Sequence, residues 1–270
     1  MIEQVIKEEQ RILNDMTQEL ETAKSYSMPL VSGFKVGSVV RGKSGRYYKG
    51  ANLEVTTHYN LHAEQSAIHN AYINGEETIT HVIVTALPCG HCRQFLYGIN
   101  PDMIVYVEDS KYLLKDLIPE PFSKKDLGIT NIVKPLYSVI KNVEFYTIMG
   151  LSLLSCQAGY SPLLKTNGGV AILANGKKYC GTFIEDPALN PSILPIMGAL
   201  SQLFLDNGNT DDITDISVDT VAEVENSNSM LHYNNTVEIA KYLGVDKNII
   251  SHNYAIRNIL TNEELENERD

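Results

Sequence analysis

The chain is poor in the features that mark secreted and membrane proteins. Its 270 residues include four cysteines, no tryptophan and no apolar run long enough to span a membrane. A disulfide framework would need more cysteines at this length, and a spanning helix would need roughly 20 apolar residues. The first 24 residues carry charges of both signs, which is untypical of a signal or transit peptide. These absences predict a cytoplasmic protein with no membrane partner.

Positive charge is also scarce. The sequence has 22 lysines and arginines against 33 aspartates and glutamates, which gives a formal net charge of −11. Such an acidic field repels polyphosphate, so no nucleic-acid partner is expected, whereas a small neutral ligand would be indifferent to it. The hydrophobic content of 43% is that of an ordinary globular protein, and the length suffices for one large or two ordinary domains.

The sequence does contain an alternation of strand and helix patterns. The turn residues 42–45 lie between two strand-like stretches within residues 34–55, and a helical pattern over residues 61–74 ends at Gly75. The other elements expected up to residue 158 are strands over 81–86 and 103–107, a helix over 88–97, an irregular connection with one short helix over 111–134, and a helix over 143–158. This alternation predicts a layered α/β domain.

The second half of the sequence repeats landmarks of the first. GKKYCGTFIE, residues 176–185, aligns with GRYYKGANLE, residues 45–54, and a helical run over 193–205 matches the helix over 61–74. The strands expected after that run cover residues 213–218 and 230–233. A repeat of this length predicts a duplicated fold.

The second copy lacks the chemical groups of the first. It has Ile193 where the alignment places His62, Pro195 where it places Glu64, and no paired cysteines. We therefore expect a degenerate copy that keeps the scaffold without the chemistry. The acidic tail, LTNEELENERD, is typical of an exposed, frayed helix.

Three residues of the first half have the chemistry and spacing of metal ligands. His62, Cys89 and Cys92 each fall at the start of a predicted helix, and a predicted strand separates the two helices. A lone His-x-Glu carries little information, and a lone Cys-x-x-Cys could be a redox pair. Together the three supply the nitrogen and sulfur atoms that Zn²⁺ prefers in a tetrahedral site. The sequence therefore predicts one zinc ion per chain.

Two observations indicate that this zinc is catalytic rather than structural. Helix N-termini favour the thiolate forms of Cys89 and Cys92. With His62 they make three protein ligands, because His91 is expected to point away from a metal that both cysteines share. Structural zinc usually has four protein ligands, whereas catalytic zinc keeps its fourth position for water. Glu64 is expected near the metal without ligating it, where a general acid or base is useful.

The combination of H-x-E with P-C-x-x-C is the signature of zinc-dependent nucleobase deaminases. The sequence resembles the cytidine deaminases, in particular the branch whose long, internally duplicated subunits form homodimers. The resemblance covers about residues 28–254. The motifs that carry it are GANLE at 50–54, HAEQSAI at 62–68, PCGHCRQF at 88–95 and EDPALNP at 185–191.

The resemblance implies an α/β, three-layer cytidine-deaminase-like fold, with a mixed sheet flanked by helices, present twice and degenerate in the second copy. The expected segments are an N-terminal helix over 1–25, a catalytic zinc-binding domain over 26–135, a linker helix over 136–158, and a non-catalytic domain with the acidic tail over 159–270. The implied reaction is hydrolytic deamination of cytidine and deoxycytidine to uridine and deoxyuridine plus ammonia, in pyrimidine salvage. Zinc would lower the pKa of a water molecule to about 7, and Glu64 would shuttle the protons.

The resemblance also implies roles for residues around the substrate. Asn52 and Glu54 match the positions that bind the 3′-hydroxyl of the ribose, and residues two apart on a strand point to one face. Phe34 matches the aromatic residue that packs on the pyrimidine, and Ala63 matches the position whose backbone reads the base edge. Because both sugars have the 3′-hydroxyl, no preference between ribose and deoxyribose is predicted.

In long-subunit relatives, residues of the partner chain complete each active site. Phe122 and Ala188 match such positions, so a homodimer with shared active sites is expected. The chain departs from these relatives at Ala86, where they often have tyrosine, and in a short loop between Glu54 and His62. Both departures bear on the affinity for the substrate.

Two other functions share parts of this pattern. A polynucleotide cytosine deaminase would need a basic groove and stacking aromatic residues, which the net charge of −11 and the lack of tryptophan disfavour. A non-enzymatic, zinc-stabilised scaffold would not need Glu64 beside the metal. Turnover of cytidine, compared with that of a cytosine-containing oligonucleotide, separates the three functions.

Overall fold

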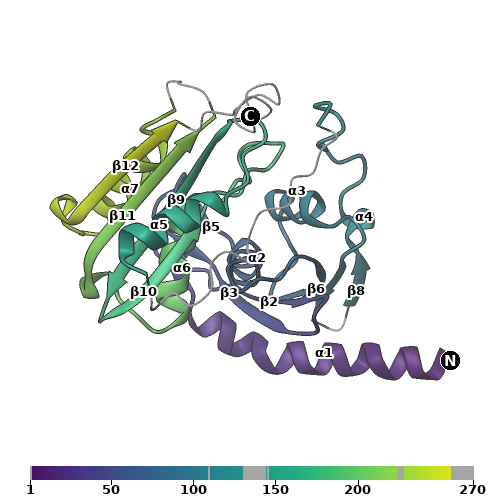
Figure 1. Cartoon of the computed structure of the whole chain (residues 1–270). Helices are drawn as coiled ribbons and strands as arrows, with labels where there is room; N and C mark the ends of the chain where they lie inside the picture. The colour runs from purple at the N-terminus through teal and green to yellow at the C-terminus, as the bar shows by residue number, and fades with distance from the viewer. Residues whose placement is uncertain (1, 109, 130–143, 145, 224–227, 257–270) are drawn as a thin grey trace, which may run out of the picture.

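A computed structural model describes residues 2–108, 110–129, 144, 146–223 and 228–256 of the chain. It shows two α/β halves that lie side by side, with the first helix running beneath the sheet of the first half (Figure 1). None of the helices in these ranges is long and apolar enough to cross a membrane.

The first half is built on a five-stranded mixed sheet. Its elements are α1 (Ile2–Ser25), β1 (Met28–Pro29), β2 (Gly37–Gly42), β3 (Tyr47–Ala51), β4 (Leu53–Glu54), β5 (Asn60–Leu61), α2 (Ala63–Ile73), β6 (Ile79–Val84), α3 (Gly90–Ile99), β7 (Ile104–Val107), β8 (Ser110–Leu113) and α4 (Leu114–Leu117). The strand order is β3-β2-β6-β7-β8, in which β6 and β7 are parallel and the other neighbours are antiparallel. The short strands β1, β4 and β5 form a separate small sheet.

Helices cover both faces of the main sheet. On one face, α1 buries Ile12 and Met16, which lie one helical turn apart, in a cluster with Val39 of β2. On the other face, α2 packs so closely that a Cβ atom on Gly50 of β3 would lie 2.1 Å from the backbone nitrogen of Ala67. The prediction of a three-layer α/β fold with a mixed sheet is confirmed (Figure 1).

The second half repeats this architecture. Its elements are α5 (Ile148–Gln157), β9 (Thr166–Ala174), β10 (Lys177–Thr182), α6 (Pro195–Leu205), the 3-10 helix Thr210–Asp212, β11 (Ile213–Ala222), α7 (Leu231–Tyr242), the 3-10 helix Lys247–Ile249 and β12 (Ile250–Ile256). The strand order β10-β9-β11-β12 corresponds to β3-β2-β6-β7, with two antiparallel pairs followed by a parallel pair in each sheet. The duplication predicted from the sequence is confirmed.

The structure corrects the alignment of the two copies. In the first half, Leu61 pairs in antiparallel fashion with β4, and His62 is the N-cap of α2. In the second half, Ile193 makes the same kind of pair with Ile184, and Leu194 is the N-cap of α6. Ile193 therefore corresponds to Leu61, and Leu194 corresponds to His62.

The sequence alignment of Ile193 with His62, and of Pro195 with Glu64, is thus wrong by one position. The loop between Glu185 and Ile193 is one residue longer than the loop between Glu54 and Leu61. An alignment based on the preceding strands, without a gap in this loop, is therefore shifted by one residue in the helix. The counterpart of Glu64 is Ile196, the second residue of α6. The conclusion that this position in the second copy has no acid is unchanged.

The strand predicted over residues 230–233 is also wrong. These residues form the N-cap and first turn of α7, and the parallel strand of the second sheet is β12. Thr236, Ile239 and Ala240 are buried at helical spacing, on a helix that packs against β11. A short apolar run does not reveal its secondary structure, and here the residues that follow it decide for a helix.

Two segments near the junction of the halves differ in smaller ways. The edge strand β8 occupies part of the chain that is predicted to be irregular, and the short helix expected there is α4. The helix predicted over residues 143–158 begins with α5 at Ile148, after its N-cap Thr147. The domain boundary predicted at residue 135 and the acidic tail lie outside the described residues.

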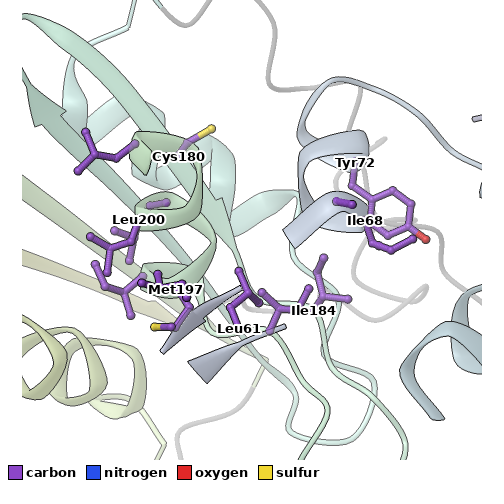
Figure 2. Packing of buried hydrophobic residues seen from close by; sticks show 14 of the residues in the cluster. Leu61, Ile68, Tyr72, Cys180, Ile184, Met197 and Leu200 are labelled. Atoms are coloured by element: carbon purple, nitrogen blue, oxygen red, sulfur yellow. The ribbon is translucent and has the colours of Figure 1, made fainter. Parts of the chain in front are cut away.

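The two halves share one hydrophobic core. Residues from both halves belong to it and are labelled in Figure 2: Leu61, Ile68, Tyr72, Cys180, Ile184, Met197 and Leu200. Within this core α2 and α6 are joined by a hydrogen bond of 2.6 Å between the hydroxyls of Ser66 and Ser201. His69 Nε2 of α2 also accepts a hydrogen bond of 3.3 Å from the backbone of Thr182. The second half thus helps to hold α2, the helix that begins after His62.

Candidate metal centre and active site

His62, Cys89 and Cys92 meet where two helices begin. His62 is the N-cap of α2, and Cys89 is the N-cap of α3, whose first turn contains Cys92. The ligand atoms of the three side chains all lie within 4.8 Å of one another, and Cys89 Sγ is 3.5 Å from His62 Nδ1. The structure brings the three predicted ligands together, and they are the one group of this kind among the described residues.

The two cysteines have the chemistry of a metal site. The hydrogen bond with Cys92, and to a smaller extent the one with His62, lowers the pKa of the Cys89 thiol to about 3, so this sulfur is a thiolate at neutral pH. Burial raises the pKa of Cys92, and a bound cation is the group that would make both sulfurs thiolates together. Two thiolates and one imidazole, at the positive ends of two helices, fit Zn²⁺.

Glu64 lies beside the ligands and is the second residue of α2. Its side chain is buried, with 4% of the residue exposed. Burial raises the pKa of the carboxyl group, so Glu64 can hold a proton at a higher pH than an exposed glutamate. A carboxyl group in this position can exchange protons with a molecule bound next to the metal.

A cavity of about 380 Å³ opens beside these residues, which is the size of a small-molecule site. The predicted site residues that line it are Phe34, Asn52, Glu54, His62, Ala63, Glu64 and Cys89. Four predicted substrate contacts, from three separate parts of the first half, therefore surround the same space as the metal ligands.

Asn52 and Glu54 form one hydrogen-bonded wall of the cavity. Asn52 Nδ2 donates to Glu54 Oε1 at 3.1 Å, and Glu54 accepts hydrogen bonds from the backbone and the hydroxyl of Ser32, each at 2.7 Å. Burial acts to raise the pKa of Glu54, but the bonds from Ser32 and Val31 outweigh it and leave this pKa lowered. The wall presents a carboxylate and an amide in fixed positions, and such a pair can bind a hydroxyl group.

Phe34 stands at the mouth of the cavity. Its side chain is 61% exposed, and Val31 and Leu87 on the same rim are 53% and 51% exposed. Ala86 also lines the cavity. The rim therefore carries apolar surface that a ligand or a second chain could cover.

Phe122 and Ala188 are not among the described residues that line this cavity. Both lie in loops next to α3. Gln94 Nε2 of α3 donates to the carbonyl oxygen of Phe122 at 2.8 Å, and the backbone of Ala188 donates to Asp186 Oδ1 at 2.8 Å. Gly98 of α3 gives Asp186 room, since a Cβ atom there would lie 3.1 Å from its Oδ2. Their role in the site of a partner chain stays a prediction.

His91 stacks on the ring of His62 and is not part of the ligand group. The ring centres are 4.7 Å apart, and the planes differ by 13°. The group of side chains that lie close enough to share a metal contains the two cysteines and His62 but not the residue between the cysteines. The stacked ring instead supports the imidazole of His62 from one side.

Gln65 is a residue of the site that the sequence analysis missed. Its Oε1 accepts a hydrogen bond of 3.0 Å from the backbone of His62, and its Nε2 donates to the carbonyl oxygen of Pro191 in the second half at 2.7 Å. The residue is 1% exposed. The available signal was a glutamine three residues after a helix N-cap, which is part of a capping box. Through Gln65, a loop of the second half reaches His62, one of the three candidate ligands.

The corresponding place in the second half is filled by side chains. The ring of His232 lies 4.9 Å from that of Phe183, between ring centres, and occupies the space that a Cβ atom on Gly168 would need. Phe183 follows β10 as Asn52 follows β3. Within the described part of the second half, no three side chains gather as metal ligands.

The chain is similar to known zinc-binding deaminases. Two family models match the chain, both described as "Cytidine and deoxycytidylate deaminase zinc-binding region", over residues 10–108 and 114–238. A crystal structure of cytidine deaminase from Mycobacterium leprae aligns with 40% of this chain and 98% of its own, at 26% identity and a TM-score of 0.38.

Two bacterial proteins named cytidine deaminase are similar over most of the chain. The one from Haemophilus ducreyi is 31% identical over 226 residues, which are 81% of this chain and 74% of that protein. The one from Actinobacillus pleuropneumoniae serotype 5b is 34% identical over 188 residues, which are 67% of this chain and 63% of that protein. The chain therefore belongs to the cytidine and deoxycytidylate deaminase family of zinc-binding proteins.

Proposed function

We propose that the chain is a cytidine deaminase, which converts cytidine and deoxycytidine into uridine and deoxyuridine with release of ammonia. The observation that carries this proposal is that Glu64 and the metal ligands adjoin a nucleoside-sized cavity whose wall holds Asn52 and Glu54. We assign the reaction to pyrimidine salvage and the protein to the cytoplasm.

The reaction needs a nucleophile at C4 of the pyrimidine and a group that moves protons. Zinc held by His62, Cys89 and Cys92 would supply a Lewis acid that lowers the pKa of a water molecule. Glu64 takes one proton from the attacking water and delivers it to N3, and then takes the proton of the new C4 hydroxyl group and delivers it to the departing amine. Water adds at C4 and the C4–N4 bond breaks, so that ammonia leaves and a carbonyl group remains.

The cavity suits a nucleoside better than a nucleotide. Asn52 and Glu54 offer a donor and an acceptor to the sugar, Phe34 offers a ring to the base, and the small Ala63 lets the base approach the backbone of α2. No lysine or arginine is found among the described residues that line the cavity. A phosphate on the sugar would therefore meet the carboxylate of Glu54 without a cation beside it.

We also propose a homodimer in which each chain completes the site of the other. Phe122 is 44% exposed, and Leu189, next to Ala188, is 60% exposed, although neither lines the cavity of its own chain among the described residues. Phe34 leaves apolar surface at the mouth of that cavity. In a two-fold symmetric dimer, the loops that carry Phe122 and Leu189 in one chain would cover the apolar rim at Phe34 of the other chain.

Turnover of free nucleosides tests the proposed activity. Protein with a measured zinc content is given cytidine, deoxycytidine or a cytosine-containing oligonucleotide, and the ultraviolet absorbance and the release of ammonia are followed. Deamination of the nucleosides alone supports the proposal. Deamination of the oligonucleotide would point to a polynucleotide deaminase, and no turnover by zinc-loaded protein would point to a non-enzymatic scaffold.

A further inference from the structure

A loop of the first half that lines the cavity is folded as a compact turn. It joins β4 to β5, and Thr56 and Thr57 of this loop line the cavity together with Asn60, the first residue of β5. Thr56 Oγ1 accepts hydrogen bonds from the backbone of His58 at 3.2 Å and of Tyr59 at 3.0 Å. Because these bonds are internal, they fix the shape of the loop but not its position relative to the rest of the molecule.

Tyr59 connects this loop to the second half. Its hydroxyl donates to Glu238 Oε2 of α7 at 2.7 Å, and Asn235 Oδ1 of the same helix lies 3.4 Å away. The ring of Tyr59 is partly buried against the shared core. Burial, followed in size by the hydrogen bond with Glu238, raises the pKa of Tyr59 to about 12, so the hydroxyl keeps the proton that it donates.

The helix that receives this bond is the counterpart of the helix that carries the cysteines. In both sheets this helix follows the central strand and precedes the parallel strand, as α3 does after β6 and α7 after β11. In α7, Asn235 and Glu238 are three residues apart and lie on one face. The degenerate copy thus uses this helix to hold the cavity loop of the other copy.

We propose that Tyr59 is a positioning residue, which fixes the cavity loop to α7 through Glu238 and thereby sets the affinity for the substrate. The inference rests on the proposed function, because it places this loop at the sugar end of the cavity, where Asn60 pairs with Glu54. Without the bond, the loop has more freedom in the free enzyme, and binding must order it again. The proton transfers at Glu64 are unaffected, so the change falls on KM rather than on kcat.

Tyr59→Phe tests this directly, since it removes the hydroxyl and keeps the ring. We expect KM for cytidine to rise roughly three- to tenfold, with kcat changed by less than about twofold and the zinc content unchanged. Glu238→Ala should raise KM by a similar factor. The double variant should be no worse than either single variant, because both remove the same bond.

Tyr179→Phe is a matched control. Tyr179 also donates its hydroxyl to a carboxylate oxygen, Asp206 Oδ2, at 2.7 Å, but from the edge strand β10, and neither residue is among the described residues that line the cavity. This variant should lose a comparable bond and keep the wild-type KM. An equal rise of KM in both tyrosine variants would indicate a general loss of stability and would overturn the inference.

Hydrogen exchange separates this inference from the proposed activity. The backbone amides of residues 55–61 should exchange faster in Tyr59→Phe than in the wild type or in Tyr179→Phe. Unchanged exchange, or an unchanged KM in an active enzyme, overturns the inference and leaves the deaminase proposal intact. If the wild type does not deaminate cytidine, the deaminase proposal fails, and the exchange comparison alone decides whether Tyr59 fixes the loop.

Discussion

His62 and Glu64 stand two residues apart at the start of α2, yet the structure holds them in different ways. The backbone of His62 is bound by Gln65, and its ring is stacked on His91. The carboxyl group of Glu64 is buried next to Cys92, and burial is the main influence on its pKa. The candidate ligand His62 is thus fixed in orientation, whereas Glu64 is placed where it can gain and lose a proton.

Glu64→Gln should bind zinc normally and lose nearly all turnover. The amide has the size of the carboxyl group, so the buried site is not emptied, but it cannot carry the proton from water to N3. General acid–base groups contribute about 10²- to 10⁴-fold, so kcat should fall by at least about a hundredfold. The measurement is kcat together with zinc per chain, and a zinc-loaded variant that kept a tenth of the wild-type kcat would contradict the assigned role.

Cys89→Ala or Cys92→Ala should lose zinc and activity together, because each removes one of the three proposed ligands. Cys156 and Cys180 provide the control. Both are buried, and burial raises their pKa values to about 12 and about 11, so they are ordinary thiols at neutral pH. Replacing both by alanine should leave one zinc per chain by metal analysis, and loss of zinc from this control would show that the ligand assignment is incomplete.

Gln65→Leu should weaken zinc binding without touching a ligand. The substitution keeps the approximate volume but leaves the buried N–H of His62 and the carbonyl of Pro191 without their bonds from Gln65. Loss of such an outer contact typically costs about 10- to 100-fold in metal affinity or activity. Competition with a chelator measures the affinity, and an unchanged zinc affinity and kcat would mean that His62 is held well enough without Gln65.

At the scale of elements, the corresponding helices α2 and α6 pack against each other with approximate two-fold symmetry. One pair of contacts breaks this symmetry: Ser66 faces Ser201, whereas the corresponding residues Gly198 and His69 face each other. Ser66 Oγ of α2 accepts a hydrogen bond of 3.2 Å from the backbone of Ala51. Gly198 of α6 corresponds to Ser66 of α2 and has no hydroxyl group. The backbone N–H of Thr182, which is the counterpart of Ala51, therefore donates to His69 instead. Burial lowers the pKa of His69 to about 4, so its ring is neutral and can accept this bond.

His69→Ser combined with Gly198→Ser should be more stable than the two single changes suggest. Gly198→Ser alone puts a Cβ atom 2.4 Å from His69 Nε2, and His69→Ser alone leaves a void and an unpaired N–H on Thr182. Each should cost about 1–3 kcal/mol. Together they restore the serine pair that the other side of the interface already has in Ser66 and Ser201. Urea unfolding of all four proteins measures the coupling, and strictly additive losses would contradict this account.

Local chemistry made the metal site predictable from the sequence. Cys89 and Cys92 lie within one helical turn, and His62 and Glu64 lie within another, so residue types and spacing were enough to predict that they lie together. The partner of Gln65 is 126 residues away and that of Tyr59 is 179 residues away. No local pattern contains such contacts, because they arise only when the two copies pack together.

The same distinction holds for the elements of the fold. The hairpin of β2 and β3 was predictable because its turn residues 42–45 are local signals. The edge strand β8 was missed because three of its four residues are exposed and leave no apolar alternation. The start of α7 was misassigned because the run at residues 230–233 is too short to distinguish a strand from a helix.

At the scale of the whole molecule, the second half supports the site of the first. Glu185 still accepts hydrogen bonds from the backbone of Leu163 and Leu164, just as Glu54 does from the loop around Ser32. The strand-end glutamate has therefore kept its structural task in the copy that lost the ligands. Four related units in a dimer of duplicated chains would also form a closed symmetric assembly, in which the degenerate units could shape both sites.

Two inactive variants should restore activity to each other if the proposed dimer shares its sites. Glu64→Gln removes the proton carrier from a chain's own site, whereas Ala188→Trp would block the site of the partner and leave its own ligands intact. After subunit exchange at equal amounts, half of the dimers are mixed, and each mixed dimer has one intact site of two. Activity should therefore recover to about a quarter of the wild-type value.

The control for this experiment combines two variants whose defects each fall in the site of the chain that carries them. Glu64 and Cys89 both serve the cavity of their own chain, so a mixed dimer of Glu64→Gln and Cys89→Ala contains one defect in each site and no intact one. This mixture should stay inactive, while light scattering shows that both mixtures form dimers. If Ala188→Trp and Glu64→Gln exchange subunits and recover no activity, or if a monomer is fully active, each chain completes its own site and the shared-site proposal is rejected.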